Sequence, residues 1–203
     1  MKISTVLLAA LLASLLVIGP GEVTEQTPPL TPDNGARTNL SPRPPEPPSS
    51  EVASGDLAPD FAYQGDDNRW RRLHDLLLQG PVVLVFGADQ ATLVAIEHER
   101  DAILRLGAFP VALLDMRNRY AWAIAKRLSL RYLVIPDSRR VIAAQFNIVD
   151  ASTQQTVPAW FVVDRGGRVR SLKRGALPRE GFSKVVATAL GLPSPAAEVP
   201  AGH

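Results

Sequence analysis

The chain has 203 residues, of which 46% are hydrophobic and 21% are charged, a balance typical of one ordinary globular domain with additional segments. Its net charge of only +2 does not indicate a nucleic-acid-binding protein. The sequence contains no cysteine, which excludes disulfides, thiolate catalysis and thiolate metal sites within these residues.

Residues 1–20 have the layout of a secretory signal. Lys2 provides a short basic start, and an apolar run follows from Thr5 to Gly19. A helix that spans a bilayer needs roughly 20 apolar residues, so this run is short for a permanent anchor. The pattern predicts export to the periplasm or secretion, and a short tether to the inner membrane is the alternative.

Residues 21–55 are rich in proline and small polar side chains, as in "TPPLTPDNG" and "LSPRPPEPPSSEVASG". Such a composition cannot bury a core, so it predicts a semi-extended linker, with a Pro-rich recognition motif as the alternative. Residues 193–203 predict a disordered tail for the same reason. The folded domain is therefore expected at residues 56–192.

The first half of the predicted domain alternates between strands and helices. Apolar runs at residues 81–86 and 109–115 are typical of strands buried on both faces. Between them, residues 90–107 carry apolar side chains at helical spacing and end in a glycine. A second helix is predicted at residues 118–128, with Asn118 as its N-cap.

In the second half of the domain the sequence predicts shorter strands and helices. An extended piece at residues 131–137 is followed by a short helix, for which Asp137 is the candidate N-cap. The segment 159–173 alternates around the turn "DRGG" and predicts an antiparallel hairpin, and residues 179–192 predict a closing amphipathic helix. This order gives an α/β fold with a central mixed sheet flanked by helices.

Three segments resemble the redoxin branch of the thioredoxin superfamily, which includes peroxiredoxins of the alkyl hydroperoxide reductase type and TlpA-like thioredoxins. They are "LAPDFAYQGDDNRWRRLHDLLLQGPVVLVF", "PDSRRVIAAQFNI" and "TVPAWFVVDRGGRVR". In the last of these, Pro158 stands where thioredoxins carry their cis-proline. The resemblance implies a thioredoxin-like fold and does not by itself transfer an activity.

The same resemblance places non-reactive residues at the active-site positions. Ala91 and Val94 align with the Cys-x-x-Cys pair of TlpA-like proteins. Thr92 matches the threonine of peroxiredoxins, but Ala95 aligns with their peroxidatic cysteine. Peroxide reduction needs a thiolate and disulfide exchange needs two sulfurs, so the resemblance implies that the family chemistry is lost. No cofactor is expected.

Other polar residues are weaker candidates for a metal, catalytic or anion-binding site. In "IEHERD", His98 and Asp101 share a helix face that could hold a metal, but the sequence has no second histidine at ligand spacing and favours a solvated face. Asp89 is interpreted as part of the cap at the helix start, with either Asp89 or Thr92 as the N-cap, rather than as a catalytic acid. Two basic groups favour solvated faces, with an anionic partner or lipid headgroups as the alternative. They are Arg69, Arg71 and Arg72, and Arg165, Arg168, Arg170, Lys173 and Arg174.

The segment before Pro158 suggests a binding function that does not depend on sulfur. In this fold it borders the active-site groove and can pair with an extended peptide through backbone hydrogen bonds. The candidate groove residues are Asp89, Thr92, Val157 and Pro158. Trp160, on the following strand, is interpreted as a core residue.

Three functional hypotheses remain open at this point. The first is an exported, cysteine-free redoxin-like domain that binds an envelope protein or an extended peptide and has no thiol chemistry. The second is an antioxidant or thiol-disulfide oxidoreductase that retains activity by an unrecognised route. The third is a structural envelope protein that depends on its Pro-rich linker or basic face. None of them involves nucleic acid, and membrane association would come through the N-terminal segment.

Overall fold

The structure is a computed structural model that describes residues 51–65 and 67–194. The predicted signal segment, most of the predicted linker and most of the predicted tail lie outside these residues. The strands are β1 Ala62–Gln64, β2 Trp70–Arg72, β3 Val82–Phe86, β4 Phe109–Leu114, β5 Leu133–Pro136, β6 Ala159–Val163 and β7 Val169–Arg174. The helices are α1 Leu73–Leu77, α2 Gln90–Arg105, α3 Asn118–Arg127, α4 Val141–Gln145 and α5 Phe182–Leu190. Among the described helices, none has both the length and the apolar character needed to cross a membrane.

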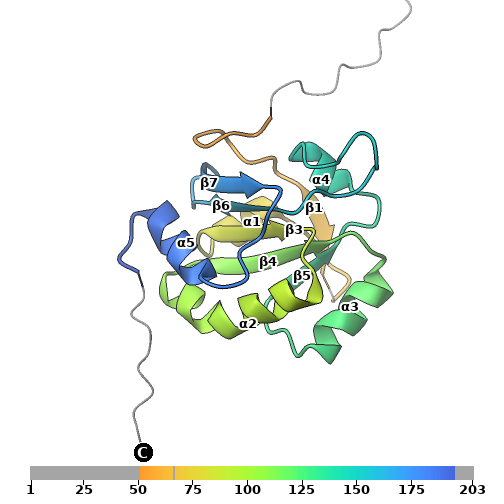
Figure 1. Cartoon of the computed structure of the whole chain (residues 1–203), viewed down its shortest axis with the longest axis horizontal. Coiled ribbons are helices and arrows are strands. Elements are labelled where there is room, and N and C mark those ends of the chain that lie inside the picture. The colour runs from red at the N-terminus through yellow and green to blue at the C-terminus, as the bar shows by residue number, and fades with distance from the viewer. Residues whose placement is uncertain (1–50, 66, 195–203) are drawn as a thin grey trace, which may run out of the picture. The chain divides into compact units, whose positions relative to one another are not determined.

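The five main strands form one mixed sheet in the order β5-β4-β3-β6-β7 (Figure 1). Strands β3, β4 and β5 are parallel, whereas β6 and β7 form the antiparallel hairpin at one edge. Strands β1 and β2 make a separate two-stranded hairpin before α1. The predicted α/β class and mixed sheet are therefore confirmed.

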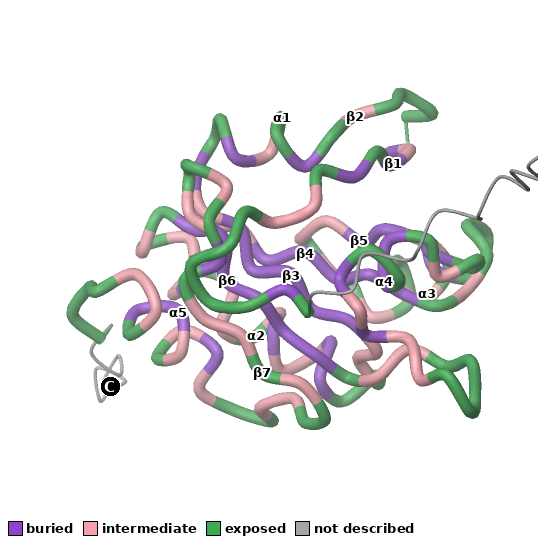
Figure 2. The backbone as a smooth tube through the Cα atoms, turned by 90° about the horizontal axis from the view of Figure 1, so that it is seen from above, coloured by how far each residue is buried: buried purple, intermediate pink, exposed green. Residues whose placement is uncertain are grey.

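The central strands carry apolar side chains on both faces because helices cover both faces of the sheet. Every residue of β3 and of β6 is buried, and Figure 2 shows these strands as the buried centre of the fold. Helices α2, α3 and α5 cover one face (Figure 1). Helices α1 and α4 and strand β1 cover the other.

An aromatic cluster fills the space between the sheet and α4. The ring centroids of Phe146 and Phe161 lie 4.9 Å apart, and those of Phe86 and Phe161 lie 5.8 Å apart in an edge-to-face arrangement. Edge-to-face contacts of this kind add about 0.5–1.5 kcal/mol beyond the burial of apolar area. The cluster fixes the last residue of β3, after which the chain turns into α2.

The residues just before the predicted domain also belong to the fold. Val52 is buried in the core, and its carbonyl accepts a hydrogen bond of 2.8 Å from the Arg174 guanidinium. The Gly55 N–H donates to the Val169 carbonyl at 2.7 Å. The linker boundary predicted at residue 55 is therefore wrong, because residues 51–55 pack against β7 and the core. Arg174 is correspondingly an anchor for this segment rather than part of a solvated basic face.

Two predicted helix starts need correction. The N-cap of α3 is Arg117, so Asn118 is the first helical residue and not the cap. Helix α4 begins at Val141 with Arg140 as N-cap in the left-handed region, four residues after the predicted cap at Asp137. The buried Asp137 carboxylate nevertheless accepts hydrogen bonds from the N–H groups of Ile142 and Ala143, at 3.3 and 2.9 Å, so it still binds the first turn.

Candidate functional site

The site is built where β3 passes into α2, beside the segment that precedes β6. Gly87 has a φ of +63°, and a β-carbon placed on it would lie only 3.1 Å from Pro158 Cα and 3.4 Å from the Thr156 carbonyl oxygen. A side chain at position 87 would therefore incur backbone strain and make an unusually tight contact with the Pro158 backbone. This close approach brings Pro158 against the start of α2, as the resemblance to thioredoxin-like proteins implies.

Asp89 is the N-cap of α2, as predicted. Its carboxylate accepts a hydrogen bond of 2.8 Å from the Thr92 N–H. Hydrogen bonds from the Thr92 hydroxyl and N–H hold the pKa of Asp89 below its usual value, and the nearby Arg179 charge lowers it further. Thr92 is itself buried. Both residues are thus occupied in forming the helix start, which leaves Asp89 ionised and without a base partner.

The three positions that align with family cysteines lie together on the first two turns of α2. Ala91 is exposed, whereas Val94 and Ala95 are half-buried. They line one side of a surface hollow of about 490 Å³, whose other lining residues are His98, Glu99, Arg179 and Glu180. The positions where the family would keep sulfur therefore face accessible space and carry only small aliphatic side chains.

The acidic residues of "IEHERD" have structural roles. Glu99 accepts hydrogen bonds from the N–H groups of Gly181 and Ser183, at 2.5 and 2.8 Å, and so caps the start of α5. Glu97 accepts from the N–H and the Nε of Arg131, at 2.8 and 2.6 Å. Asp101 pairs with Arg100 at 2.8 Å. In the described part of the chain, no three His, Asp or Glu side chains gather as a metal site requires.

The predicted backbone groove beside Pro158 is partly filled by the chain itself. The Val157 N–H donates to the Ile148 carbonyl at 2.7 Å, and Thr156 forms an isolated bridge with Val149. The Pro158 carbonyl accepts from the Gly175 N–H at 2.7 Å. A partner strand cannot use the Val157 N–H, so strand-like pairing of a peptide at Val157 and Pro158 stays a prediction for the carbonyl groups alone. Binding at this end of the fold has side chains and the remaining backbone carbonyls available to it.

Two residues of the site were missed by sequence reasoning. Arg179 precedes α5, far from α2 in sequence, yet it lines the same hollow as Ala91 and acts electrostatically on Asp89. Glu99 was assigned to a solvated face but reaches across to α5. Neither role has a local signal, because each depends on α5 packing beside α2. The structure brings Asp89 and Thr92 together with Ala91, and places Val157 and Pro158 next to Gly87.

The arrangement has no nucleophile that could carry the thiol chemistry of related folds. A helix N-terminus stabilises a thiolate, and this helix start retains that geometry while offering alanine and valine side chains. His98 is exposed on the rim of the hollow and has no hydrogen-bond or ion-pair partner within residues 51–65 and 67–194. What remains is a surface with three small aliphatic side chains on one side and His98, Glu99, Arg179 and Glu180 on the other.

Comparison with solved structures identifies similar folds at low sequence identity. The peroxidoxin BcpB from Mycobacterium tuberculosis superimposes with a TM-score of 0.62 and 21% identity, over 70% of this chain and 97% of that one. The AhpC of Enterococcus faecalis gives a TM-score of 0.60 and 15% identity, over 69% and 93% of the two chains. A thiol:disulfide interchange protein DsbE from Chlorobium tepidum, described as putative, gives 0.58 and 21%, over 70% and 100%. These values show the shared thioredoxin-like fold.

Family assignment rests on the sequence itself. No curated protein sequence matches the chain. Residues 54–172, more than half of the 203, match the AhpC/TSA family. That stretch includes the junction of β3 and α2, the Pro158 segment and most of the final hairpin, which are the parts that build the site. This cysteine-free chain therefore belongs to the AhpC/TSA family.

Proposed function

We propose that this protein is a member of the AhpC/TSA family without thiol redox chemistry, which works as an exported binding module of the cell envelope. One observation carries the proposal. The helix start that would hold the reactive sulfur is intact in its cap and packing, but its side chains are Ala91, Val94 and Ala95, and the 203 residues contain no cysteine. A scaffold of this kind can bind but has no thiol through which to carry out thiol–disulfide exchange.

The binding surface in this proposal is the hollow beside α2. Its aliphatic side suits an apolar side chain of a partner, and Arg179 on its rim can pair with an acidic one. The Val157 N–H does not contribute, because it is already bonded within the chain. The partner is therefore proposed to be an envelope protein that is recognised through side chains at this hollow.

Export is the second part of the proposal. It is supported by the basic start at Lys2 and the apolar run from Thr5 to Gly19. In a cell fractionation of the full chain, the protein should appear in the periplasmic or membrane fraction, and mass spectrometry of its N-terminus decides between a cleaved signal and a retained anchor. Recovery of the uncleaved chain only in the cytoplasm would contradict export.

Activity assays test the loss of thiol chemistry. The purified full chain is incubated with hydrogen peroxide, an organic hydroperoxide or insulin, with dithiothreitol or thioredoxin as the electron donor. We expect no turnover above that of the donor alone. Turnover that disappears in the Asp89→Asn and Thr92→Val variants would instead support the alternative of an oxidoreductase acting by another route.

The absence of cysteine makes the binding surface easy to map. A single cysteine introduced at Ala95 carries a photo-activated cross-linker into the hollow, and one introduced at the exposed Ala144 on α4 is the matched control. In envelopes of cells that produce these variants, we expect a cross-linked product from the Ala95 position that is lost in Arg179→Gln. Equal products from both positions would contradict a role for this hollow.

A further inference from the structure

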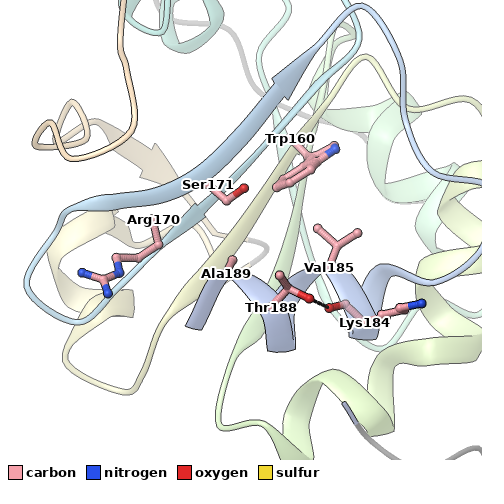
Figure 3. A pocket seen from close by; sticks show the side chains of 7 residues that line it. All are labelled: Trp160, Arg170, Ser171, Lys184, Val185, Thr188 and Ala189. Carbon is pink, nitrogen blue, oxygen red and sulfur yellow. Dashed lines mark hydrogen bonds between the residues drawn. The ribbon is translucent and has the colours of Figure 1, made fainter. Parts of the chain in front are cut away.

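A hollow between β7 and α5 and another beside the β1–β2 hairpin are each lined by a tryptophan. In the first, Trp160 is 7% exposed, and Figure 3 shows Arg170 and Lys184 extending away from each other. Polar groups that diverge in this way cannot hold one group of a ligand. The second hollow has a volume of about 400 Å³, and its tryptophan, Trp70, is 72% exposed.

The walls of the hollow beside the hairpin come from two segments that are far apart in the sequence. Trp70 lies opposite Gln64 in the antiparallel hairpin, so the two side chains project from one face of it. Both line the hollow. Ser138, Arg139 and Val141, from the segment that joins β5 to α4, line it as well. The hairpin and this segment therefore form one open hollow.

Trp70 and Val141 give this hollow an exposed apolar surface. Their side chains are 72% and 55% exposed, and neither belongs to the buried core. Exposed apolar side chains that share a hollow mark a surface for a ligand or a partner segment. A tryptophan offers a large contact area at such a surface.

The hollow also carries a cation without a partner among the described residues. The exposed guanidinium of Arg139 makes no ion pair or hydrogen bond with them, whereas the neighbouring Arg140 pairs with Asp115 at 2.6 Å. Asp137 lines the hollow too, but its buried carboxylate is bonded to the first turn of α4. A carboxylate from outside residues 51–65 and 67–194 can therefore pair with Arg139.

The sequence just before residue 51 has the matching chemistry. Residues 46–50 read "EPPSS", so the acidic Glu46 is followed directly by Pro47 and Pro48. Proline fixes φ near −65° and favours the polyproline II conformation. Segments of this kind bind to grooves lined by aromatic side chains, because little conformational entropy is lost on binding.

The described chain begins within reach of the hollow. Arg174 Nη2 donates to the carbonyls of Val52 and Phe146, at 2.8 and 3.5 Å, so the start of the described chain lies beside the C-terminal end of α4. The hollow is at the other end of this helix, whose five residues rise about 7.5 Å. Residues 49–51 span about 10 Å when extended, which is enough to bring Pro48 to the hollow.

We propose that residues 46–50 of this chain dock in the hollow beside the β1–β2 hairpin as a short polyproline II segment. The two proline rings pack against Trp70, and Glu46 pairs with Arg139. The contact need not be strong in itself, because a segment joined directly to the domain acts at an effective concentration in the millimolar range. Docking sets where the Pro-rich linker leaves the domain. The hollow shares no lining residue with the one beside α2, so the proposal is independent of the function proposed above.

The indole N–H signals of the full, ¹⁵N-labelled chain test this docking. The sequence has three tryptophans, and the signal of Trp70 is assigned by its loss in Trp70→Phe. In Pro47→Gly/Pro48→Gly we expect the Trp70 signal to shift while the other two stay in place, because glycine removes both the rings and the fixed φ. Pro28→Gly/Pro29→Gly, the same change earlier in the linker, is the matched control and should shift none of them.

Charge reversal tests whether Glu46 and Arg139 meet. Arg139→Glu should also shift the Trp70 signal, and the double variant Arg139→Glu/Glu46→Arg should return it toward its parent position, because the opposite charges are again paired. The proposal is overturned if the proline variant shifts the signal no more than its control, or if Glu46→Arg does not restore it. A Trp70 signal that changes on dilution would assign the hollow to a second copy of the chain and would equally overturn docking within one chain.

Discussion

The last residue of β3 packs in the core, whereas residues at the start of α2 border an accessible hollow. Phe86 is fully buried in the aromatic cluster with Phe146 and Phe161. A few residues later, Ala91, Val94 and Ala95 border an accessible hollow and add little to the core. In this family the second region is where the sulfur would be expected. Because stability resides in the first region, the reactive residues can be replaced without loss of the fold.

The helix start between these regions belongs structurally to the first. Gly87 lies against Pro158, and Asp89 caps α2 through the Thr92 N–H. Both features are needed for the turn from β3 into α2 whether or not a cysteine follows. We therefore expect substitutions to lower the free energy of unfolding most in the aromatic cluster, less at Gly87 and Asp89, and least at Ala91 and Val94.

Phe161→Ala should have the largest effect. The ring is fully buried between Phe86 and Phe146, so its removal should lower the free energy of unfolding by about 3–5 kcal/mol. Denaturant unfolding followed by circular dichroism measures this. Leu78→Ala, at a side chain 70% exposed, is the control and should change it by less than about 0.5 kcal/mol. A loss below 1 kcal/mol at Phe161 would contradict the assignment of stability to the cluster.

Gly87→Ala should have the next largest effect and lower the free energy of unfolding by about 2 kcal/mol or more. Alanine there would have to adopt a positive φ, and its β-carbon would press against the Pro158 backbone. Gly175→Ala is a matched control. Its φ is +85°, but no atom lies within 4 Å of the added carbon, so it incurs the backbone strain alone. If both variants lose the same stability in thermal unfolding, the contact with Pro158 contributes nothing.

Asp89→Ala should cost about 1 kcal/mol through loss of the α2 cap. Because its hydrogen bonds lower the pKa of Asp89, the folded pKa lies below the unfolded one. The ionised cap therefore stabilises the protein above the unfolded pKa, and this stabilisation is lost as pH falls through the folded pKa. The stability difference between Asp89→Ala and the parent should accordingly shrink below pH 4, and a pH-independent difference would argue against the cap.

The double variant Ala91→Cys/Val94→Cys should change the stability of the reduced protein least, by less than about 0.5 kcal/mol. It should nevertheless gain chemistry, since two residues three apart on a helix start can form a disulfide and the helix N-terminus lowers the thiol pKa. Insulin reduction with dithiothreitol is the readout. A pair at the exposed Tyr120 and Ala123 of α3, also three residues apart but not at a helix start beside β3, is the control and should stay inactive. A stable but inactive Ala91/Val94 variant would show that more than sulfur is missing.

Much of the fold could be predicted from the sequence because its signals are local. The apolar runs that became β3 and β4 are continuous, and the turn "DRGG" predicts the β6–β7 hairpin. The N-cap at Asp89 was correct for the same reason. The predicted N-cap of α3 was wrong by one residue. Arg117 and Asn118 give nearly equivalent helix starts, and the sequence does not fix which of them has helical dihedral angles.

The errors arise where distant segments meet. Residues 51–55 look like linker because most of them are small or polar, but Val52 bonds to Arg174 at the end of β7 and Gly55 to Val169 at its start. The groove before Pro158 looked open because its pairing with Ile148 depends on how the loop after α4 folds back. Arg179 and Glu99 joined the α2 surface only through the packing of α5. None of these contacts leaves a periodic or spaced pattern in the sequence.

The most direct test of the central claim is hydroperoxide consumption by the purified, metal-free full chain, with dithiothreitol as electron donor. We expect a catalytic rate equal to that of the donor alone at every protein concentration, because the 203 residues contain no cysteine thiol. A rate that rises in proportion to protein and disappears in Thr92→Val would contradict it.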